Sequence, residues 1–115
     1  MDEKELLSLT SLRQELLHIT QQLMAEDIRR NEGDLSACTG AVYEARLQRR
    51  KHIEALFKEV YLQLDRLPST ERQLIELRYI EGCSWSFVAH ALGFSEDHVR
   101  GKLRKRALKF LKIKV

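Results

Sequence analysis

The sequence is poor in cysteine, proline and glycine: its 115 residues include two Cys, one Pro and five Gly. Cys38 and Cys83 lie far apart, belong to no CxxC pair and have no histidine beside them. This pattern favours two reduced thiols over a zinc site. So few helix breakers, together with plenty of Leu, Glu, Lys and Arg, are typical of a helical protein.

Long apolar runs are missing as well. No uninterrupted apolar segment approaches the roughly 18 to 20 residues that cross a bilayer. The N-terminus, MDEKELLSLTS, carries charges of both signs and does not lead into the apolar core of a secretory signal. We therefore expect no membrane association and a protein that works in the cytoplasm.

Motifs for catalysis are not found. The four histidines, at 18, 52, 90 and 98, lack the spacing of metal ligands. There is no glycine-rich phosphate loop and no nucleophile motif. We expect no enzyme, and neither a metal nor another cofactor.

Charge is distributed unevenly along the chain. Residues 1–66 carry a net charge of −2, whereas residues 67–115 carry +5. The last 18 residues contain no acid and eight bases: Arg100, Lys102, Arg104, Lys105, Arg106, Lys109, Lys112 and Lys114. A helix dipole explains two or three cations near a C-terminus, but not eight. Such a one-ended positive field favours a polyanionic partner.

The N-terminal part predicts two helices. Residues 2–30 read as one long helix with leucines and isoleucine at heptad spacing: Leu9, Leu12, Leu16, Ile19 and Leu23. Residues 31–40 read as a loop because they combine two glycines with Asn, Asp, Ser and Thr. The short loop predicts that the second helix, 41–66, folds back as an antiparallel, coiled-coil-like hairpin.

The second helix repeats the apolar pattern in its latter half, at Ile53, Phe57, Val60, Leu64 and Leu67. Pro68 ends it, since proline disfavours helical geometry in the preceding residue. We therefore divide the chain into residues 1–66, a hairpin for dimerisation or partner docking, and residues 67–115, a DNA-binding domain.

Residues 67–115 predict three helices. The first reaches about Ile80, the second runs from about Trp85 to Leu92, and the third approaches the C-terminus. Ser84 and Ser95 are the expected N-caps. The fold class is accordingly all-α.

The second and third of these helices have the pattern of a helix-turn-helix. Ala89 is the small residue where the two helices cross, and Gly93 forms the turn. The apolar residues that lock the helices together are Val88, Leu92, Phe94, Val99 and Leu103. The alternative is an ordinary helical hairpin with a glycine turn, which would not require the basic third helix.

A regular helix, at about 100° per residue from Val99, turns Leu103, Arg106 and Phe110 inward. It turns Arg100 and Arg104 outward, and these are the expected bidentate contacts to guanine. Leu108 and Leu111 fall off the inward stripe and would need cover from the hairpin or a second protomer. The candidate DNA-contacting residues are Ser95, Asp97, His98, Arg100, Gly101, Lys102, Arg104, Lys105 and Lys109.

Their expected roles differ. Lys102, Lys105 and Lys109 suit phosphate contacts, which position a protein without reading sequence. Asp97 suits the positive end of the helix dipole, or alternatively accepts from a cytosine amino group. Gly101 either lets the backbone approach DNA closely or is a tolerated weakness in the helix.

Residues 67–111 resemble region 4 of sigma-70-type transcription factors. The resemblance lies in LP before the first helix, ERQLIELRY within it, VAHALGFS across the glycine turn, and HVRGKLRKR after it. It implies binding to a promoter element through the last helix and contact with RNA polymerase. No segment of these 115 residues resembles the sigma region that melts promoter DNA, so we do not expect a complete sigma factor.

The whole chain is similar to the ArpU-like late transcription regulators of phages that infect Gram-positive hosts. The similarity lies in a helical hairpin followed by LDRLP, ELRYIEG, SW and a region 4-like end. It implies a sequence-specific regulator at phage or prophage promoters, bound to double-stranded DNA and associated with the nucleoid. The hairpin is then expected to form a homodimer or to dock on RNA polymerase.

Two other functions stay open. A phage small terminase subunit also combines a helix-turn-helix with coiled helices, but assembles into rings for DNA packaging. A sigma-like interaction module would use the same fold to hold RNA polymerase without reading DNA.

Overall fold

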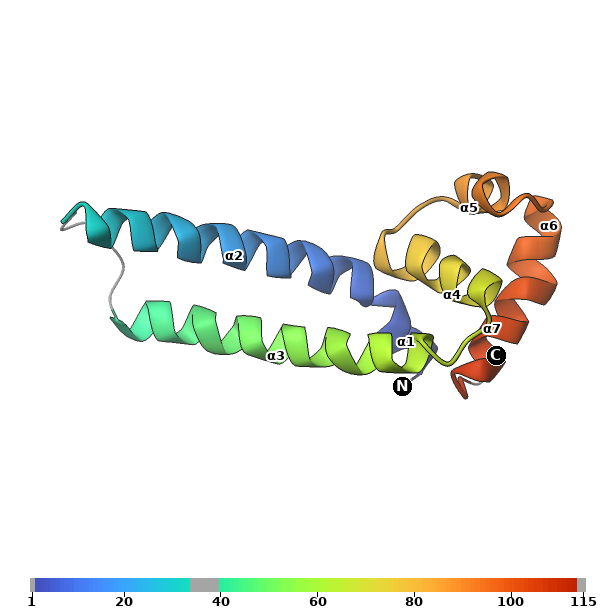
Figure 1. Ribbon diagram of the computed structural model, residues 1–115, viewed down its shortest axis with the longest axis horizontal. Coiled ribbons are helices and arrows are strands. Elements are labelled where there is room, and N and C mark those ends of the chain that lie inside the picture. The colour runs from blue at the N-terminus through green and yellow to red at the C-terminus, as the bar shows by residue number, and fades with distance from the viewer. Residues whose placement is uncertain (1, 34–39, 114–115) are drawn as a thin grey trace. The chain divides into compact units, whose positions relative to one another are not determined.

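The computed structural model describes residues 2–33 and 40–113, and within those ranges every regular element is a helix. The elements are α1 (Glu3–Leu7), α2 (Leu9–Asn31), α3 (Gly40–Leu64), α4 (Ser69–Ile75), η1 (Glu76–Ile80), α5 (Trp85–Leu92), α6 (Glu96–His98), η2 (Val99–Leu103) and α7 (Arg104–Phe110). η1 and η2 are π-helical turns. Figure 1 shows the order of the elements along the chain. The all-α prediction is confirmed.

The predicted loop at 31–40 lies largely outside the described residues, as do Cys38 and Lys114. The chain divides into two compact units, residues 14–58 and residues 1–13 together with 59–115. The predicted functional division at residue 66 stays a prediction, since compactness does not assign a role to either part.

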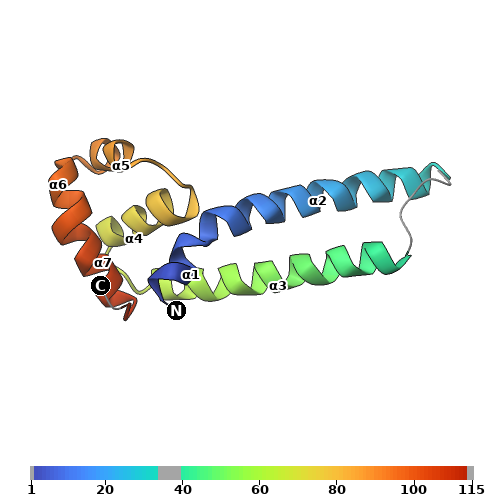
Figure 2. The same ribbon diagram turned by 180° about the vertical axis from the view of Figure 1, so that it is seen from behind.

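The unit of residues 14–58 is a pair of antiparallel helix segments from α2 and α3, which run side by side in both views (Figures 1 and 2). Its large buried apolar side chains are Ile19, Leu23, Ile53 and Phe57. Of the predicted heptad residues in this unit, Leu16 is only half-buried. The antiparallel hairpin is therefore present, with a narrow apolar seam.

Polar contacts supplement this seam. Arg49 donates two hydrogen bonds of 2.9 Å to the carboxylate of Glu15, and these bonds lower the pKa of Glu15. Closer to the far end, the Tyr43 hydroxyl donates to Asp27 at 2.9 Å, and Arg30 lies 4.4 Å from the Tyr43 ring centroid. The hydrogen bond to Asp27 raises the pKa of Tyr43. The hairpin is thus joined by ion pairs and hydrogen bonds as well as by apolar packing.

The second unit contains α1, the first turn of α2, the last turn of α3, and every helix from α4 to α7. α4 packs against α7, and α5 packs against α4, η1, α6 and η2. The fully buried side chains at the centre include Leu6, Leu64, Leu74, Ile75, Val88, Val99 and Leu108. The last helix of the domain, α6 through α7, is therefore fixed by contacts with both α4 and α5.

The first helix is interrupted, whereas the sequence predicts one helix over residues 2–30. α1 ends at Leu7 and α2 begins at Leu9. The Ser8 hydroxyl donates to the carbonyl of Glu5 at 2.6 Å, and such back-bonding by serine bends helices. α1 starts at the cap Asp2, whose carboxylate accepts from the Glu5 amide at 2.7 Å.

Residues 2–13, which precede the unit of residues 14–58, belong to the same unit as the helix-turn-helix. Leu6 is completely buried there. The Thr10 hydroxyl donates to the carbonyl of Tyr79 at 2.8 Å, although 69 residues separate the two. The N-terminal residues are therefore a structural part of the unit that contains α4 to α7.

Candidate nucleic-acid interface

The turn after α5 has the geometry that the sequence predicts. Gly93 has a φ of 76°, in the left-handed region that glycine adopts without strain. The Phe94 amide donates to the Ala89 carbonyl at 3.1 Å and the Gly93 amide to His90 at 3.3 Å. These two bonds form a Schellman motif, which satisfies the last carbonyls of α5. The turn therefore ends α5 and lets the chain reverse into α6.

Both predicted N-caps are confirmed. The Ser84 hydroxyl accepts from the Phe87 amide and starts α5, and the Ser95 hydroxyl accepts from the His98 amide and starts α6, each at 3.2 Å. Ala89 is 5% exposed at the crossing of the two helices. Hydrogen bonds between residues a few positions apart thus fix the start of each helix and the turn between them.

Aromatic and cationic side chains hold the start of α5. The Trp85 ring meets Tyr79 edge to face, with centroids 6.4 Å apart. The Arg78 guanidinium lies 4.7 Å from the Trp85 centroid and donates to the carbonyl of Cys83 at 2.9 Å. The sequence analysis did not identify this clamp, which joins η1 to the start of α5 across the turn at Cys83.

The last helix, which we call the recognition helix, runs through α6, η2 and α7 (Glu96–Phe110). Its middle turn, η2, is π-helical. A π-turn accommodates one extra residue within an α-helix. Every residue after η2 is therefore rotated by roughly 100° from its position on a regular α-helix.

This rotation explains which side chains are buried in α7. It places Arg104, Ala107, Leu108 and Leu111 between about −20° and about +80° from the direction of Val99, and it moves Phe110 and Arg106 to about −80° and about −120°. Ala107, Leu108 and Leu111 are indeed at most 7% exposed. Leu108 and Leu111 are covered within the unit of residues 1–13 and 59–115, which includes both ends of the predicted hairpin, so their burial requires no second protomer.

The same rotation corrects two predicted inward residues. Phe110 is 50% exposed, and the Arg106 side chain is 60% exposed with a contact of 3.4 Å to the buried carboxylate of Glu71. Phe94, predicted to lock the helices together, is 44% exposed and contacts His98 with ring centroids 5.0 Å apart. For Phe110 and Arg106 the prediction fails because it assumes a regular helix through residues 99–103, whereas Phe94 lies in the turn before this helix.

Arg104 also differs from its predicted outward direction. Its side chain is 23% exposed, forms an ion pair with Glu3, and donates to the Tyr79 hydroxyl at 3.3 Å. Burial opposes the charge of Arg104, but the hydrogen bonds with Tyr79 and Glu3 outweigh it and raise the pKa of the guanidinium. Arg104 is thus held within its own unit, and a contact with a base requires it to leave these partners.

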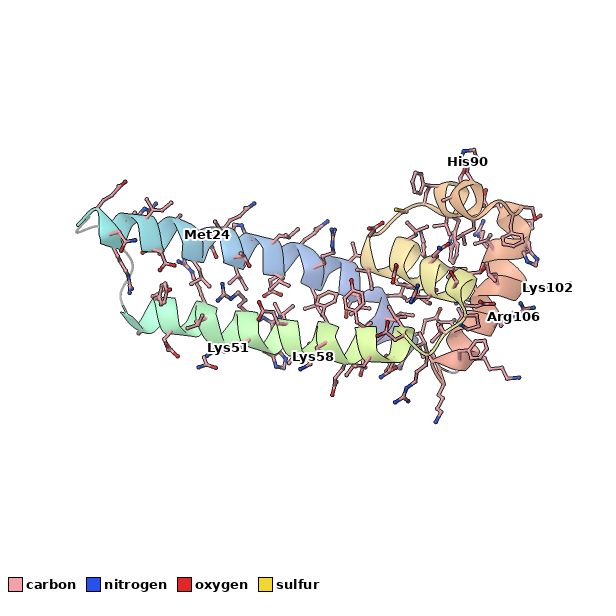
Figure 3. All side chains as sticks on the ribbon, viewed as in Figure 1. Met24, Lys51, Lys58, His90, Lys102 and Arg106 are labelled. Atoms are coloured by element: carbon pink, nitrogen blue, oxygen red, sulfur yellow. The ribbon has the colours of Figure 1, made fainter. Side chains whose placement is uncertain are left out.

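The other basic candidates are exposed along the recognition helix: Arg100, Lys102, Lys105 and Lys109. The Arg100 side chain is 58% exposed and lies 3.4 Å from Glu96, one turn earlier. Figure 3 labels Lys102 and Arg106 on this helix. The structure therefore brings a row of cations to the surface of the helix that follows the turn.

The remaining candidates lie at the start and middle of the helix. Asp97 is exposed in the first turn, and Ser95 is committed to capping. An added Cβ at Gly101 would meet no atom within 4 Å. Packing within the protein therefore does not require glycine at this position.

The sequence analysis did not identify two acidic residues that contact this helix. Glu3 pairs with Arg104 across 101 positions of the chain, and Glu71 pairs with Arg106 across 35. Glu71 is 4% exposed. No local pattern in the sequence marks Glu3 or Glu71, because the partner of each residue depends on the fold.

The turn, its caps and the exposed cations define a helix-turn-helix of the DNA-binding class. Comparison with family models identifies it further: residues 63–112 match the family described as Sigma-70, region 4. These residues form a sigma-70 region 4-like helix-turn-helix, as the resemblance predicted, and this family of domains is regulatory and DNA-binding rather than enzymatic. Searches of curated proteins and of solved structures gave no match.

Two further observations concern metals and membranes. Within residues 2–33 and 40–113, no cluster of three or more His, Cys, Asp or Glu is placed to hold a metal ion. In the same part of the chain, no helix combines the length and the apolar character needed to cross a bilayer.

Proposed function

We propose that the chain is a sequence-specific transcription regulator of phage or prophage type that binds double-stranded DNA in the bacterial cytoplasm, at the nucleoid. The observation that carries the proposal is the row of exposed cations on the helix that follows a capped glycine turn. In helix-turn-helix proteins this second helix enters the major groove, with its N-terminal residues against the bases. The resemblance of the whole chain to ArpU-like regulators supports the phage context.

Arg100 is the residue proposed to read a base. It is exposed early in the recognition helix, and its ion pair with Glu96 is on the surface, so it can be exchanged for a base contact. A bidentate contact between arginine and guanine contributes about 1–3 kcal/mol of discrimination. Arg104 is the weaker candidate because Glu3 and Tyr79 hold it.

Lys102, Lys105 and Lys109 are proposed to contact phosphates, since flexible ammonium groups suit these point charges. Ser95 and His98 lie in the first turn, where backbone amides and small polar groups meet phosphate oxygens. Asp97 is proposed to accept from a cytosine amino group. The open space around Gly101 supports its role in close approach of the backbone to DNA.

The hairpin is proposed to form a homodimer, and the region 4-like domain to contact RNA polymerase. A dimer would read two half-sites about 10 base pairs apart, or a multiple of that spacing. Residues 1–66 would then provide dimerisation or docking, and residues 67–115 DNA recognition.

The test is selection of DNA fragments from host and phage genomes on the purified protein at physiological salt. The salt concentration is held at the physiological value because any basic helix binds duplex DNA weakly at low ionic strength. We expect discrete enrichment upstream of genes. Enrichment at a packaging site, with a mass of eight or more chains, would instead favour a small terminase subunit. No enrichment, together with retention of RNA polymerase, would favour the interaction module.

Substitution of Arg100 by Gln tests the base contact. We expect its affinity for the selected site to fall by about 5- to 150-fold, while affinity for unrelated DNA changes little. Arg72→Gln is the matched control, because Arg72 is also partly exposed and faces Glu76 one turn away at 3.9 Å, but on α4. Equal losses for the two variants would contradict the assignment of Arg100.

A further inference from the structure

The α2 segment of the hairpin exposes an apolar stripe. Leu17, Met24 and Ile28 are 52%, 60% and 57% exposed. Their spacings of seven and four residues place them on one side of the helix. They lie outside the seam with α3, where Ile19 and Leu23 are buried.

The polar surroundings of this stripe are unusual because they are nearly uncharged. From residue 16 to residue 25, no exposed side chain of α2 is Lys, Arg, Asp or Glu; these exposed residues are Leu17, His18, Gln21, Met24 and Ala25. The exposed surface of α3 in the same unit is charged, with Glu44, Arg49, Lys51, Glu54 and Lys58. Figure 3 shows Met24 on α2, with Lys51 and Lys58 on the edge of α3 away from it. A helix face that meets water normally carries charges, as α3 does.

The hairpin also has a small apolar core. The unit of residues 14–58 has only Ile19, Leu23, Ile53 and Phe57 as large apolar side chains that are buried among its described residues. Small units bury a low fraction of their surface, and oligomerisation is one common source of further stability. An exposed apolar stripe within an uncharged surface marks the side on which such a partner binds.

We propose that the stripe of Leu17, Met24 and Ile28 is the contact surface for a second copy of this chain, with the two α2 helices antiparallel. A second copy presents the same surface, and the charges beside Ile28 are paired within their own chain, Asp27 with Tyr43 and Arg29 with Glu26, so neither chain buries an unpaired charge. The charges at the ends of the surface select the direction. Arg13 precedes the stripe and Glu32 follows it, and both are exposed.

In the antiparallel arrangement, Arg13 of each chain approaches Glu32 of the partner subunit, and Leu17 lies opposite the partner's Ile28. In the parallel arrangement, each charge lies beside its own copy, which is unfavourable. The inference deepens the homodimer of the proposed function. Its tests measure mass and cross-linking without DNA, so it can fail while DNA binding holds, and the reverse.

The first test measures the mass of the full chain by sedimentation, over a range of concentrations. We expect twice the 13.5 kDa of one chain. Leu17→Glu combined with Met24→Glu should give the mass of a single chain and weaken dimerisation by at least about tenfold, because it buries carboxylates without partners. Ala45→Glu combined with Ala55→Glu, on exposed positions of α3, is the matched control and should dimerise as the wild type does. A monomeric wild type, a ring, or unchanged dimerisation of the α2 variant would overturn the proposal.

The second test does not depend on the folding of a charged variant. Cys38 and Cys83 are replaced by Ser, and chains with Leu17→Cys and chains with Ile28→Cys are prepared with different tags. We expect mixed oxidation to cross-link unlike chains and not like chains. Cross-links between like chains would overturn the antiparallel arrangement, and an absence of cross-links would overturn the interface.

Discussion

Gly82 and Gly93 provide a controlled test of how the N-terminal residues hold the helix-turn-helix unit. Both glycines have a φ of 76°. Around Gly93 an added Cβ would meet no atom within 4 Å, whereas at Gly82 it would lie 2.8 Å from Cγ2 of Thr10. The two sites therefore share the backbone cost of a substitution and differ in one contact.

Alanine at either site must adopt a left-handed conformation, which costs roughly 1–2 kcal/mol. For Gly93→Ala we expect this loss alone. Gly82→Ala also pushes against Thr10, whose hydroxyl is bound to the Tyr79 carbonyl at 2.8 Å and so resists rotation. Overpacking of this kind typically adds about 1–3 kcal/mol. The total loss for Gly82→Ala should therefore be about 2–5 kcal/mol.

Urea denaturation, followed by circular dichroism, measures the free energy of unfolding of both variants. Thr10→Ser completes a double-mutant cycle with Gly82→Ala, because serine keeps the hydroxyl and removes Cγ2. In the Thr10→Ser background, the loss for Gly82→Ala should fall to the level of Gly93→Ala. Equal losses for the two alanine variants in the wild-type background, or no relief from Thr10→Ser, would refute the reasoning that Thr10 packs on this turn.

Three other predictions each concern one residue. Lys112 has a φ of 58° just after α7, a left-handed conformation that glycine adopts without strain. Lys112→Gly should therefore raise the free energy of unfolding, measured by urea denaturation, by about 1 kcal/mol. A loss of stability would contradict the left-handed conformation of Lys112. The hydrogen bonds from Arg49 lower the pKa of Glu15 in the folded state. They therefore stabilise the fold at pH values above 4.5, the ordinary pKa of Glu15, and this stabilisation is lost as pH falls through the lower pKa of the folded state. Melting temperatures measured against pH should show this loss in the wild type and not in Glu15→Gln. Lys109→Gln should lower affinity for all DNA sequences alike and reduce the slope of log affinity against log salt by about 0.9, whereas a change confined to one sequence would argue against a phosphate contact.

The sequence predicted the parts of the site that depend on near neighbours. Ser84 and Ser95 cap their helices, and Gly93 adopts the left-handed turn, because each of these features involves residues within a few positions of one another. The exposure of Arg100 follows from its place one residue after Val99, at the start of the π-turn, because the change of helical phase applies to the residues after this turn. Its contact with DNA remains a prediction.

What the sequence by itself determined is therefore the all-α class, the hairpin, and a helix-turn-helix followed by a basic helix. Tertiary structure decided the rest. The π-turn at Val99–Leu103 rotates α7, which buries Leu108 and Leu111 and exposes Phe110. The pairing of Glu3 with Arg104 joins residues 101 positions apart. Periodicity and capping act within one or two helical turns, whereas helical phase and distant ion pairs depend on which helices pack together, and no local pattern encodes that choice.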